Sequence, residues 1–173
     1  MSTPDFDAIV IGAGAAGLLC AALAWQRGLR VLLIDHAERV AEKIRISGGG
    51  RCNFTNRDLD VRAPQRHYVG QNPQFCRSAL SRYTPQDFIA LLQQHGLAFH
   101  EKHKGQLFLD RSAQDLIDLL LAECARGQVT HWQPCRVKNV AFLAASVDQA
   151  SASSYQSDTD KGPVQARSLV LAT

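Results

Sequence analysis

The spacing of hydrophobic positions changes several times along the chain, and each change predicts a new element. Residues 7–11, DAIVI, form a short apolar run rich in β-branched side chains that ends at a glycine, which predicts a buried parallel strand. In residues 14–27 the apolar side chains follow the spacing of a mostly buried helix, and Gly28 fits its C-terminal cap. Residues 30–35, RVLLID, predict a second buried strand that ends in an acid. Together these stretches predict a βαβ unit.

The pattern after this unit alternates between polar stretches and well-marked elements. Residues 36–46 predict a short polar helix or turn, residues 46–56 (ISGGGRCNFTN) predict neither a helix nor a packed strand, and residues 57–83 predict an irregular surface path. Three elements follow: a helix that starts at Thr84-Pro85 and closes at Gly96, a hairpin over 97–110 turning at Lys104-Gly105, and a helix from Ser112 to Gly127.

The last part of the chain predicts strands and a polar turn. Residues 129–147 alternate well enough for one or two strands, residues 151–162 predict a polar loop or hairpin tip, and residues 166–173 predict a buried strand. We therefore expect one α/β domain over residues 1–173, a three-layer Rossmann-like fold with added helices and a small antiparallel hairpin.

Residues 12–17, GAGAAG, match the pattern G-x-G-x-x-G between the first strand and the first helix. Gly12 permits the tight turn, Gly14 lets the backbone approach a pyrophosphate, and Gly17 allows close packing of helix on strand. Asp35, eighteen positions after Gly17, suits a ribose diol. The motif predicts an adenine dinucleotide without deciding between NAD and FAD. The alternatives are a ligand-free turn and, for Asp35, a solvated acid at a strand end.

The glycine triplet Gly48–Gly50 predicts a second backbone surface for the same ligand. Its amides suit a phosphate or the edge of an isoalloxazine ring, and Arg51 suits a pyrophosphate or an anionic reduced flavin. Asn53 and Asn56 offer amides for ring or sugar contacts. A flexible surface loop is the alternative.

VIGAGAAGL, followed after the acid by KIRISGGGRCNFTN, resembles the YhiN/BaiN-like family of NAD(P)/FAD-dependent oxidoreductases, and GLAFHEKHKGQLF resembles the family's next shared region. The resemblance covers essentially the whole chain and implies bound FAD, with NAD(P)H as electron donor and an unidentified small organic acceptor. The FAD contacts that it implies are Gly12, Gly14, Ala15, Ala16, Gly17, Asp35, His36, Lys43, Ser47, Gly50, Arg51, Cys52, Asn53 and Val137.

Several of these residues keep alternatives. Val137 is as consistent with plain strand core as with an adenine contact, and His36 with simple exposure. Lys43 suits a phosphate or ribose better than a role as catalytic base. A C-x4-C redox pair would need a second cysteine at position 57, where this chain has Arg57. Cys52 is therefore either a single thiol near the flavin or a packing residue. Gln106 departs from the family's Gly-Arg pattern after Gly105, so any role of that arginine is in doubt here.

Composition narrows the class of protein. The net charge of +3 and the scattered arginines predict no nucleic-acid partner. The acidic N-terminus and the short apolar stretches predict no membrane segment and a cytoplasmic location. Five unpaired cysteines indicate reduced thiols instead of a disulfide or zinc framework. His100 and His103 are expected to be surface imidazoles, with metal binding as the alternative. No catalytic acid or base is identified.

The chain stops at SLVLAT, where flavoproteins of this type return to the cofactor, so we expect an N-terminal fragment that lacks the substrate domain. The leading hypothesis is an FAD-dependent oxidoreductase. The alternatives are a non-catalytic FAD- or nucleotide-binding module, including an inactive fragment, and an NAD-only dehydrogenase.

Overall fold

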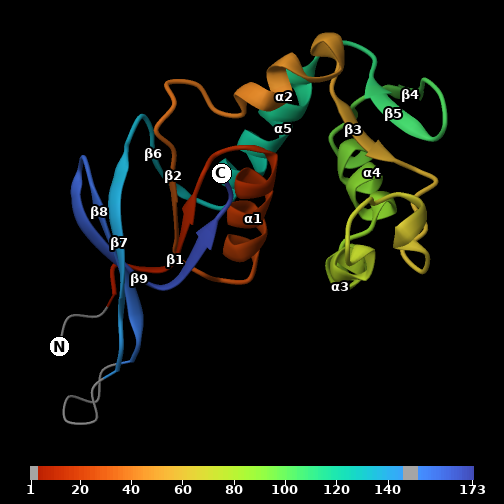
Figure 1. Cartoon of the computed structure of the whole chain (residues 1–173). Helices are drawn as coiled ribbons and strands as arrows, with labels where there is room; N and C mark the ends of the chain where they lie inside the picture. Colours follow the sequence, from red (N-terminus) through yellow and green to blue (C-terminus); the bar gives the residue numbers. More distant parts are fainter. Residues whose placement is uncertain (1–3, 146–151) are drawn as a thin grey trace. The chain divides into compact units, whose positions relative to one another are not determined.

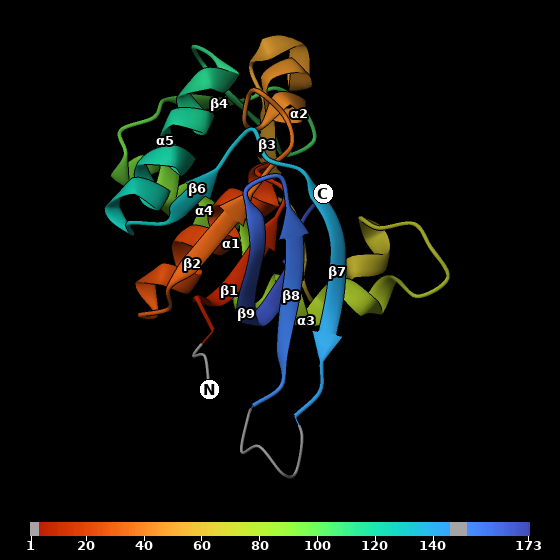
Figure 2. The same ribbon diagram turned by 90° about the vertical axis from the view of Figure 1, so that its left-hand side faces the viewer.

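The predicted βαβ unit lies at the centre of a six-stranded sheet. A computed structural model describes residues 4–145 and 152–173. They divide into two compact units, residues 1–43 with 120–173 (unit 1) and residues 44–119 (unit 2), which are described separately. In unit 1 the sheet order is β6-β2-β1-β9-β8-β7 (Figures 1 and 2). The strands are β1 (Phe6–Ile11), β2 (Val31–Ile34), β6 (Thr130–Trp132), β7 (Val137–Leu143), β8 (Ser154–Thr159) and β9 (Gly162–Leu171).

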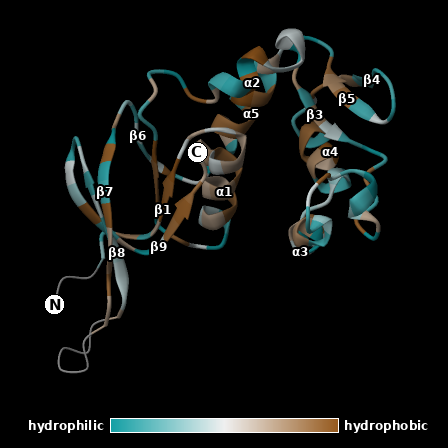
Figure 3. Cartoon of the chain, viewed as in Figure 1, coloured by the Kyte–Doolittle hydropathy of each residue, from teal (hydrophilic) through white to brown (hydrophobic). Residues whose placement is uncertain are grey.

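The four strands β6, β2, β1 and β9 are parallel, and β9, β8 and β7 continue the sheet as an antiparallel meander. The apolar runs predicted for buried parallel strands are confirmed, since β2 is buried at every position and β1 over Ala8–Val10. Figure 3 shows the same strands as predominantly hydrophobic.

Side chains on the two faces of this sheet pack against different layers. Ile9, Leu32 and Ile34 form one core cluster with Val164 and Ala166 of β9. Because successive side chains of a strand alternate, Val10 and Leu33 point to the opposite face, and α1 (Ala15–Gln26) packs against β1 and β2. The predicted three-layer Rossmann-like arrangement is therefore present, with α1 and the meander visible on either side of β1 in Figure 1.

Residues 151–162 were predicted as a polar loop or a hairpin tip; the tip is present between β8 and β9, whereas the loop prediction was wrong for β8. Ser154, Ser157 and Thr159 are buried there, because β8 lies between β7 and β9 in the meander. Small hydroxyl side chains fit that position even though they give no apolar signal. The last strand also begins earlier than predicted, at Gly162.

Unit 2 contains a three-stranded antiparallel sheet with the order β3-β5-β4 and several short helices. Its strands are β3 (Asn53–Asn56), β4 (Phe99–Glu101) and β5 (Gln106–Leu109). Its helices are α3 (Arg77–Arg82) and α4 (Pro85–Gln94) and the 3-10 turns η1 (Ser47–Gly50), η2 (Pro64–Arg66) and η3 (Pro73–Cys76). Two helices, α2 (Glu42–Ile46) and α5 (Ala113–Arg126), span the boundaries between the units.

The small sheet carries an aromatic core. The ring of Phe54 lies 5.4 Å from Phe99 and 6.1 Å from Phe88, both edge-on, while Leu107 and Leu92 are fully buried. The predicted hairpin turn is confirmed, because Lys104 and Gly105 both adopt positive φ between β4 and β5. The expectation of neither a helix nor a packed strand in residues 46–56 was wrong. The glycines form the 3-10 turn η1, and β3 pairs with β5 in the small sheet, where Phe54 packs in the aromatic core.

Candidate functional site

The dinucleotide motif of unit 1 uses its glycines for different purposes. Gly12 has φ +107°, and a side chain there would lie 2.6 Å from the carbonyl oxygen of Ala172. A side chain at Gly17 would lie 1.8 Å from the carbonyl oxygen of Gly12. These two positions therefore require glycine for packing. At Gly14 no atom lies within 4 Å of the position a Cβ would take, so the space beside this residue is open.

The open space at Gly14 lies at the N-terminus of α1. Gly14 is the N-cap residue, no side chain caps the helix, and its first turn holds no acid. Ala15 and Ala16 are exposed there. The first N–H groups of a helix lack partners within the helix and carry partial positive charge, so this end of α1 favours an anion such as a diphosphate.

Asp35 follows β2 and is tied to the glycine loop. Its Oδ2 accepts a hydrogen bond from the backbone N–H of Ala13 at 2.5 Å, and its Oδ1 accepts one from Ala37 at 2.7 Å. The side chain is only 13% exposed, so it is not a solvated acid at a strand end. Each carboxylate oxygen has a further lone pair available for a sugar hydroxyl. The neighbouring His36 is exposed, with its Nδ1 3.6 Å from Oδ1 of Asp35.

A segment that the sequence reasoning missed also lies against Asp35. The backbone N–H of Cys135 donates to the Asp35 carbonyl at 2.7 Å, and the side chain of Gln133 donates to the carbonyl of Ala37 at 2.8 Å. The available signal was the polar interruption QPC between two strands, at the carboxyl edge of the sheet. Val137, two residues on, is partly buried against the core cluster and pairs with Thr159 in the meander.

In unit 2 the glycine triplet forms a turn that only glycine adopts readily. The φ angles of Gly48, Gly49 and Gly50 are 57°, 68° and 83°, all in the left-handed region. A side chain at Gly48 would lie 2.9 Å from the ring of Phe108, whereas no atom lies within 4 Å of such a position at Gly49 or Gly50. The turn therefore packs at its first glycine and leaves the backbone open at the next two.

The residues around the triplet have distinct environments. Arg51 is exposed, and no acid among the described residues pairs with its guanidinium. Cys52 is 5% exposed, and burial raises the pKa of its thiol, which keeps it protonated near neutral pH. The end of the Asn53 amide lies 3.2 Å from the carbonyl oxygens of both Leu107 and Thr55, to which the amide nitrogen donates when it faces them. Ser47 donates its hydroxyl to the carbonyl of Ile44 at 2.8 Å.

The structure thus brings the predicted site residues together in two groups. The glycine loop and Asp35 form one group in unit 1, and Ser47 to Asn53 form another in unit 2. Lys43 is exposed on α2, where unit 1 ends. Asn56, by contrast, uses both atoms of its amide locally, in bonds to Lys104 and Asp58 of 2.9 Å each.

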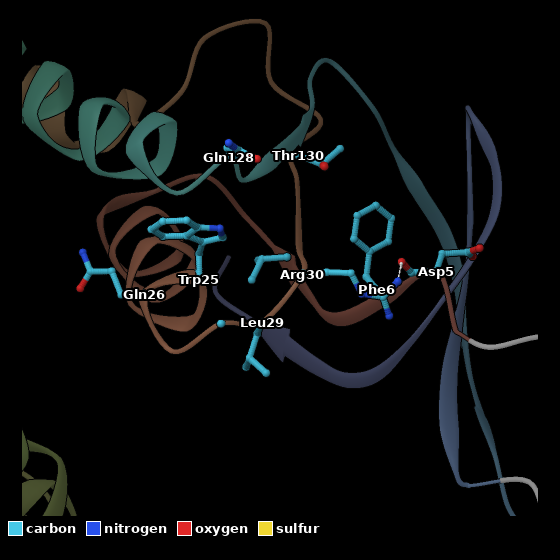
Figure 4. A pocket seen from close by; sticks show the side chains of 10 residues that line it. Asp5, Phe6, Trp25, Gln26, Leu29, Arg30, Gln128 and Thr130 are labelled. Carbon is cyan, nitrogen blue, oxygen red and sulfur yellow. Dashed lines mark hydrogen bonds between the residues drawn. The ribbon is translucent and has the colours of Figure 1, made fainter.

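A cavity of about 470 Å³ in unit 1 lies away from the motif (Figure 4). Asp5, Arg30 and Thr130 line it at the amino ends of β1, β2 and β6, beside Trp25 near the end of α1 and Leu29 in the turn that follows. Ligands of open parallel sheets bind beyond the carboxyl ends of the strands. The glycine loop and Asp35 are at that carboxyl end, so we take them, and not this cavity, as the candidate site.

Other candidate chemistry is sparse in the part of the chain that the structure describes. No group of three His, Cys, Asp or Glu side chains there is arranged to hold a metal ion. His100 instead pairs with Asp110, with Nδ1 and Oδ1 2.6 Å apart. No helix within those residues combines the length and apolarity that crossing a membrane requires.

Comparison with known proteins agrees with this geometry. A family model described as the HI0933-like protein Rossmann domain matches residues 6–173. The ribosomal RNA dihydrouridine synthase of Escherichia coli K12 is 55% identical over 136 residues, which cover 79% of this chain and 33% of that protein. The 3-dehydro-bile acid delta(4,6)-reductase of Clostridium scindens is 29% identical over 139 residues, covering 78% of this chain and 32% of the reductase. The chain spans about a third of the length of these curated relatives.

Solved structures share the fold at low sequence identity. The crystal structure of OTEMO in complex with FAD and NADP matches with a TM-score of 0.57 and 18% identity, over 99% of this chain and 26% of that one. At this identity the match shows the Rossmann-like fold alone.

Proposed function

The chain belongs to the HI0933-like Rossmann family, and from this premise we propose that it binds FAD and forms the cofactor-binding part of an oxidoreductase. The observation that carries the proposal is the open, uncapped N-terminus of α1 beside Gly14, with Asp35 bonded to the same loop at Ala13. A backbone that is bare at one glycine and tightly packed at Gly12 and Gly17 fits a diphosphate that must approach closely. The choice of FAD among the dinucleotides follows the family resemblance, and the matched OTEMO structure, which holds both FAD and NADP, shows that this fold accommodates FAD in that protein.

Each predicted contact has a part in this proposal. The N–H groups of Ala15 to Gly17 would meet the diphosphate, and Asp35 would accept hydrogen bonds from the ribose. Gly49 and Gly50 would offer open backbone, and Arg51 an unpaired positive charge, to the flavin or its phosphates. His36, Lys43, Ser47, Cys52, Asn53 and Val137 stay predicted contacts. We also propose, from the family resemblance, that NAD(P)H supplies the electrons.

The relatives' names point to a common reaction class. Uridine becomes dihydrouridine when two hydrogens add across the C5–C6 double bond, which is conjugated with the C4 carbonyl. A delta-4 double bond in a 3-dehydro steroid stands in the same relation to its carbonyl. When bound, FAD supplies hydride chemistry of this kind, in which a hydride adds to the carbon remote from the carbonyl and a proton to the adjacent carbon. We therefore propose reduction of a carbon–carbon double bond conjugated with a carbonyl.

Within that class we propose uridine in ribosomal RNA as the substrate. The E. coli relative is 55% identical, against 29% for the bile acid reductase. This proposal departs from our sequence-based expectation of no nucleic-acid partner, which the structure does not test. The expectation relied on the net charge of the whole chain and on the scattered positions of its arginines, and a whole-chain charge averages over local segments.

A visible spectrum tests the cofactor. The chain is purified, incubated with FAD and desalted, and NADH or NADPH is added without oxygen. We expect a retained flavin band that bleaches; in the whole oxidoreductase of which this chain forms the cofactor-binding part, a ribosomal RNA transcript should then restore the oxidised spectrum and gain dihydrouridine. A chain that retains no flavin would contradict the proposal, and a flavin that no nicotinamide nucleotide reduces would favour the non-catalytic module. Reoxidation by a 3-oxo delta-4 steroid but not by RNA would favour the second substrate.

A further inference from the structure

One stretch of unit 2 concentrates positive charge. Residues 61–83, which we name the basic segment, contain four arginines, His67 and no acid or lysine. Its formal charge of +4 exceeds the +3 of the whole chain. Outside the segment the chain has 15 basic residues against 16 acidic ones, which leaves a charge of −1.

The segment is folded. It contains η2, η3 and α3, and the Gln74 side chain donates to the Gln65 side chain at 3.0 Å, which joins η2 to η3. Pro64 is fully buried and accepts a 2.9 Å hydrogen bond from the backbone of Tyr68. The segment therefore holds its charged residues in a defined local structure, drawn in yellow to yellow-green in Figure 1.

Its charged and aromatic side chains are available to a partner. The four arginines are exposed, and no acid among the described residues pairs with any of their guanidinium groups; they are Arg62, Arg66, Arg77 and Arg82. Arg57, just before the segment, differs from these four arginines because its guanidinium forms an ion pair with the Glu101 carboxylate at 3.2 Å. Three large side chains of the segment are also exposed: Phe75 by 85%, Val69 by 106% and Tyr68 by 42%. Phe and Val are among the residues most often buried in proteins.

We propose that the basic segment is a contact surface for RNA. Unpaired arginines offer planar, bidentate hydrogen bonding to phosphates, and exposed rings offer stacking platforms for unpaired bases. The two features occur together within 23 residues that contain no acid, and the nearest carboxylate, that of Asp60, accepts a hydrogen bond from the Arg62 backbone. The inference rests on the proposed ribosomal RNA substrate and adds the surface that engages it outside the cofactor site.

The same residues fit an RNA better than a membrane surface. A helix that lies on a membrane needs a long amphipathic stretch with an apolar face. The longest helix of the segment, α3, has six residues, and neither Phe75 nor Val69 belongs to it. The segment also relies on arginine alone, which suits bidentate recognition of phosphate.

Binding of a fluorescein-labelled RNA hairpin with a uridine-rich loop tests the proposal on the purified chain loaded with FAD. The variants Arg66→Gln and Arg77→Gln each remove one charge, and Phe75→Ala removes the most exposed ring. Matched controls in unit 1 are Arg167→Gln, also an exposed arginine, and Phe142→Ala, a ring that is 59% exposed. Circular dichroism and retained flavin establish that each variant is folded.

We expect each arginine variant to weaken binding about 3- to 10-fold and to lower the slope of log K against log[salt] by about 1. Phe75→Ala should weaken binding at least about 5-fold with little change in that slope. The two controls should bind like the wild type. Equal affinity of segment variants and controls, no binding of the hairpin at low salt, or binding of anionic vesicles in preference to RNA would each overturn the inference. None of these outcomes alters flavin retention, so failure of the surface is distinct from failure of the proposed cofactor.

Discussion

At the level of single residues, Gly14 and Gly17 occupy one motif for opposite reasons. A side chain at Gly17 collides with backbone, while a side chain at Gly14 enters open space that we assign to a diphosphate. Sequence spacing alone predicts both roles, because the motif fixes the turn and the helix start. It could not predict that Asp35 bonds to Ala13, since this contact depends on how β2 lies beside β1.

The substitution Gly14→Ala separates the ligand role from folding. Gly14 has φ −80°, which alanine adopts without strain, so we expect the free energy of unfolding to change by less than about 1 kcal/mol. The added methyl group occupies the space of the diphosphate, and FAD binding should weaken about 10-fold, equivalent to about 1.4 kcal/mol. Urea unfolding measures the stability and flavin titration measures the affinity for FAD. Unchanged FAD affinity would contradict the assignment of the space beside Gly14 to the diphosphate.

The substitution Gly17→Ala, in contrast to Gly14→Ala, is expected to lower the stability of the fold. Its Cβ would lie 1.8 Å from the carbonyl oxygen of Gly12, so the helix must move from the strand and the free energy of unfolding should fall by at least about 2 kcal/mol. Gly70→Ala is the control, because no atom lies within 4 Å of its Cβ position and its φ is not positive. A loss below about 0.5 kcal/mol at Gly17, as for ordinary surface changes, would show that the motif relaxes easily.

At the level of elements, the sequence predicts where a capped helix begins, but it does not predict which strands pair when they are distant in the chain. The Thr84-Pro85 start of α4 is confirmed, whereas β8 was missed because its partners β7 and β9 decide which of its polar side chains are buried. Likewise, β3 forms because Phe54 packs on rings from β4 and α4, which the local glycine-rich pattern does not reveal.

The capping box of α4 gives a test of element stability. The Thr84 hydroxyl accepts a hydrogen bond from the Asp87 backbone at 3.2 Å, and the Asp87 carboxylate accepts one from the Thr84 backbone at 2.7 Å. We expect Thr84→Ala to lower the free energy of unfolding of unit 2 by about 1 kcal/mol, measured by thermal or urea unfolding. Gln93→Ala, an exposed position inside α4, should have no such effect, and an equal loss in both variants would argue against the cap.

Strand β6 gives a prediction for pH. Burial lowers the pKa of His131 below 6.5, although the charge of Asp35 opposes the shift, and Nε2 is buried without a partner among the described residues. Between the folded pKa and 6.5 the unfolded chain binds more protons at this group, so its contribution to stability is lost as the pH falls below 6.5. His131→Leu should therefore flatten the decline of unfolding free energy in that window, and the exposed control His103→Gln should not. Parallel curves for wild type and His131→Leu would contradict this account.

For the whole molecule, the sequence predicts one domain over residues 1–173 from a continuous series of elements, and the structure describes two compact units within this range. Hydrophobic periodicity reports which face of an element is buried but not which elements share a core, so α5 could be predicted as a helix and not as one that spans a boundary. Charge shows the same limit. From the sequence alone we interpret the arginines as scattered, and the significance of the basic segment depends on which of its arginines the fold leaves exposed and unpaired.

The five cysteines, all free, offer a test of both cores at once. Cys52, Cys124 and Cys135 are at most 5% exposed, which suppresses access of a reagent, and burial raises the pKa of Cys124 to about 11, which also suppresses formation of the Cys124 thiolate. Cys20 and Cys76 are partly exposed. We expect iodoacetamide at neutral pH, followed by mass spectrometry, to label Cys76 and Cys20 in the native protein and all five cysteines after unfolding in urea. Because Cys52 lies in unit 2 and Cys124 in unit 1, rapid native labelling of either one would identify the unit whose core is not closed.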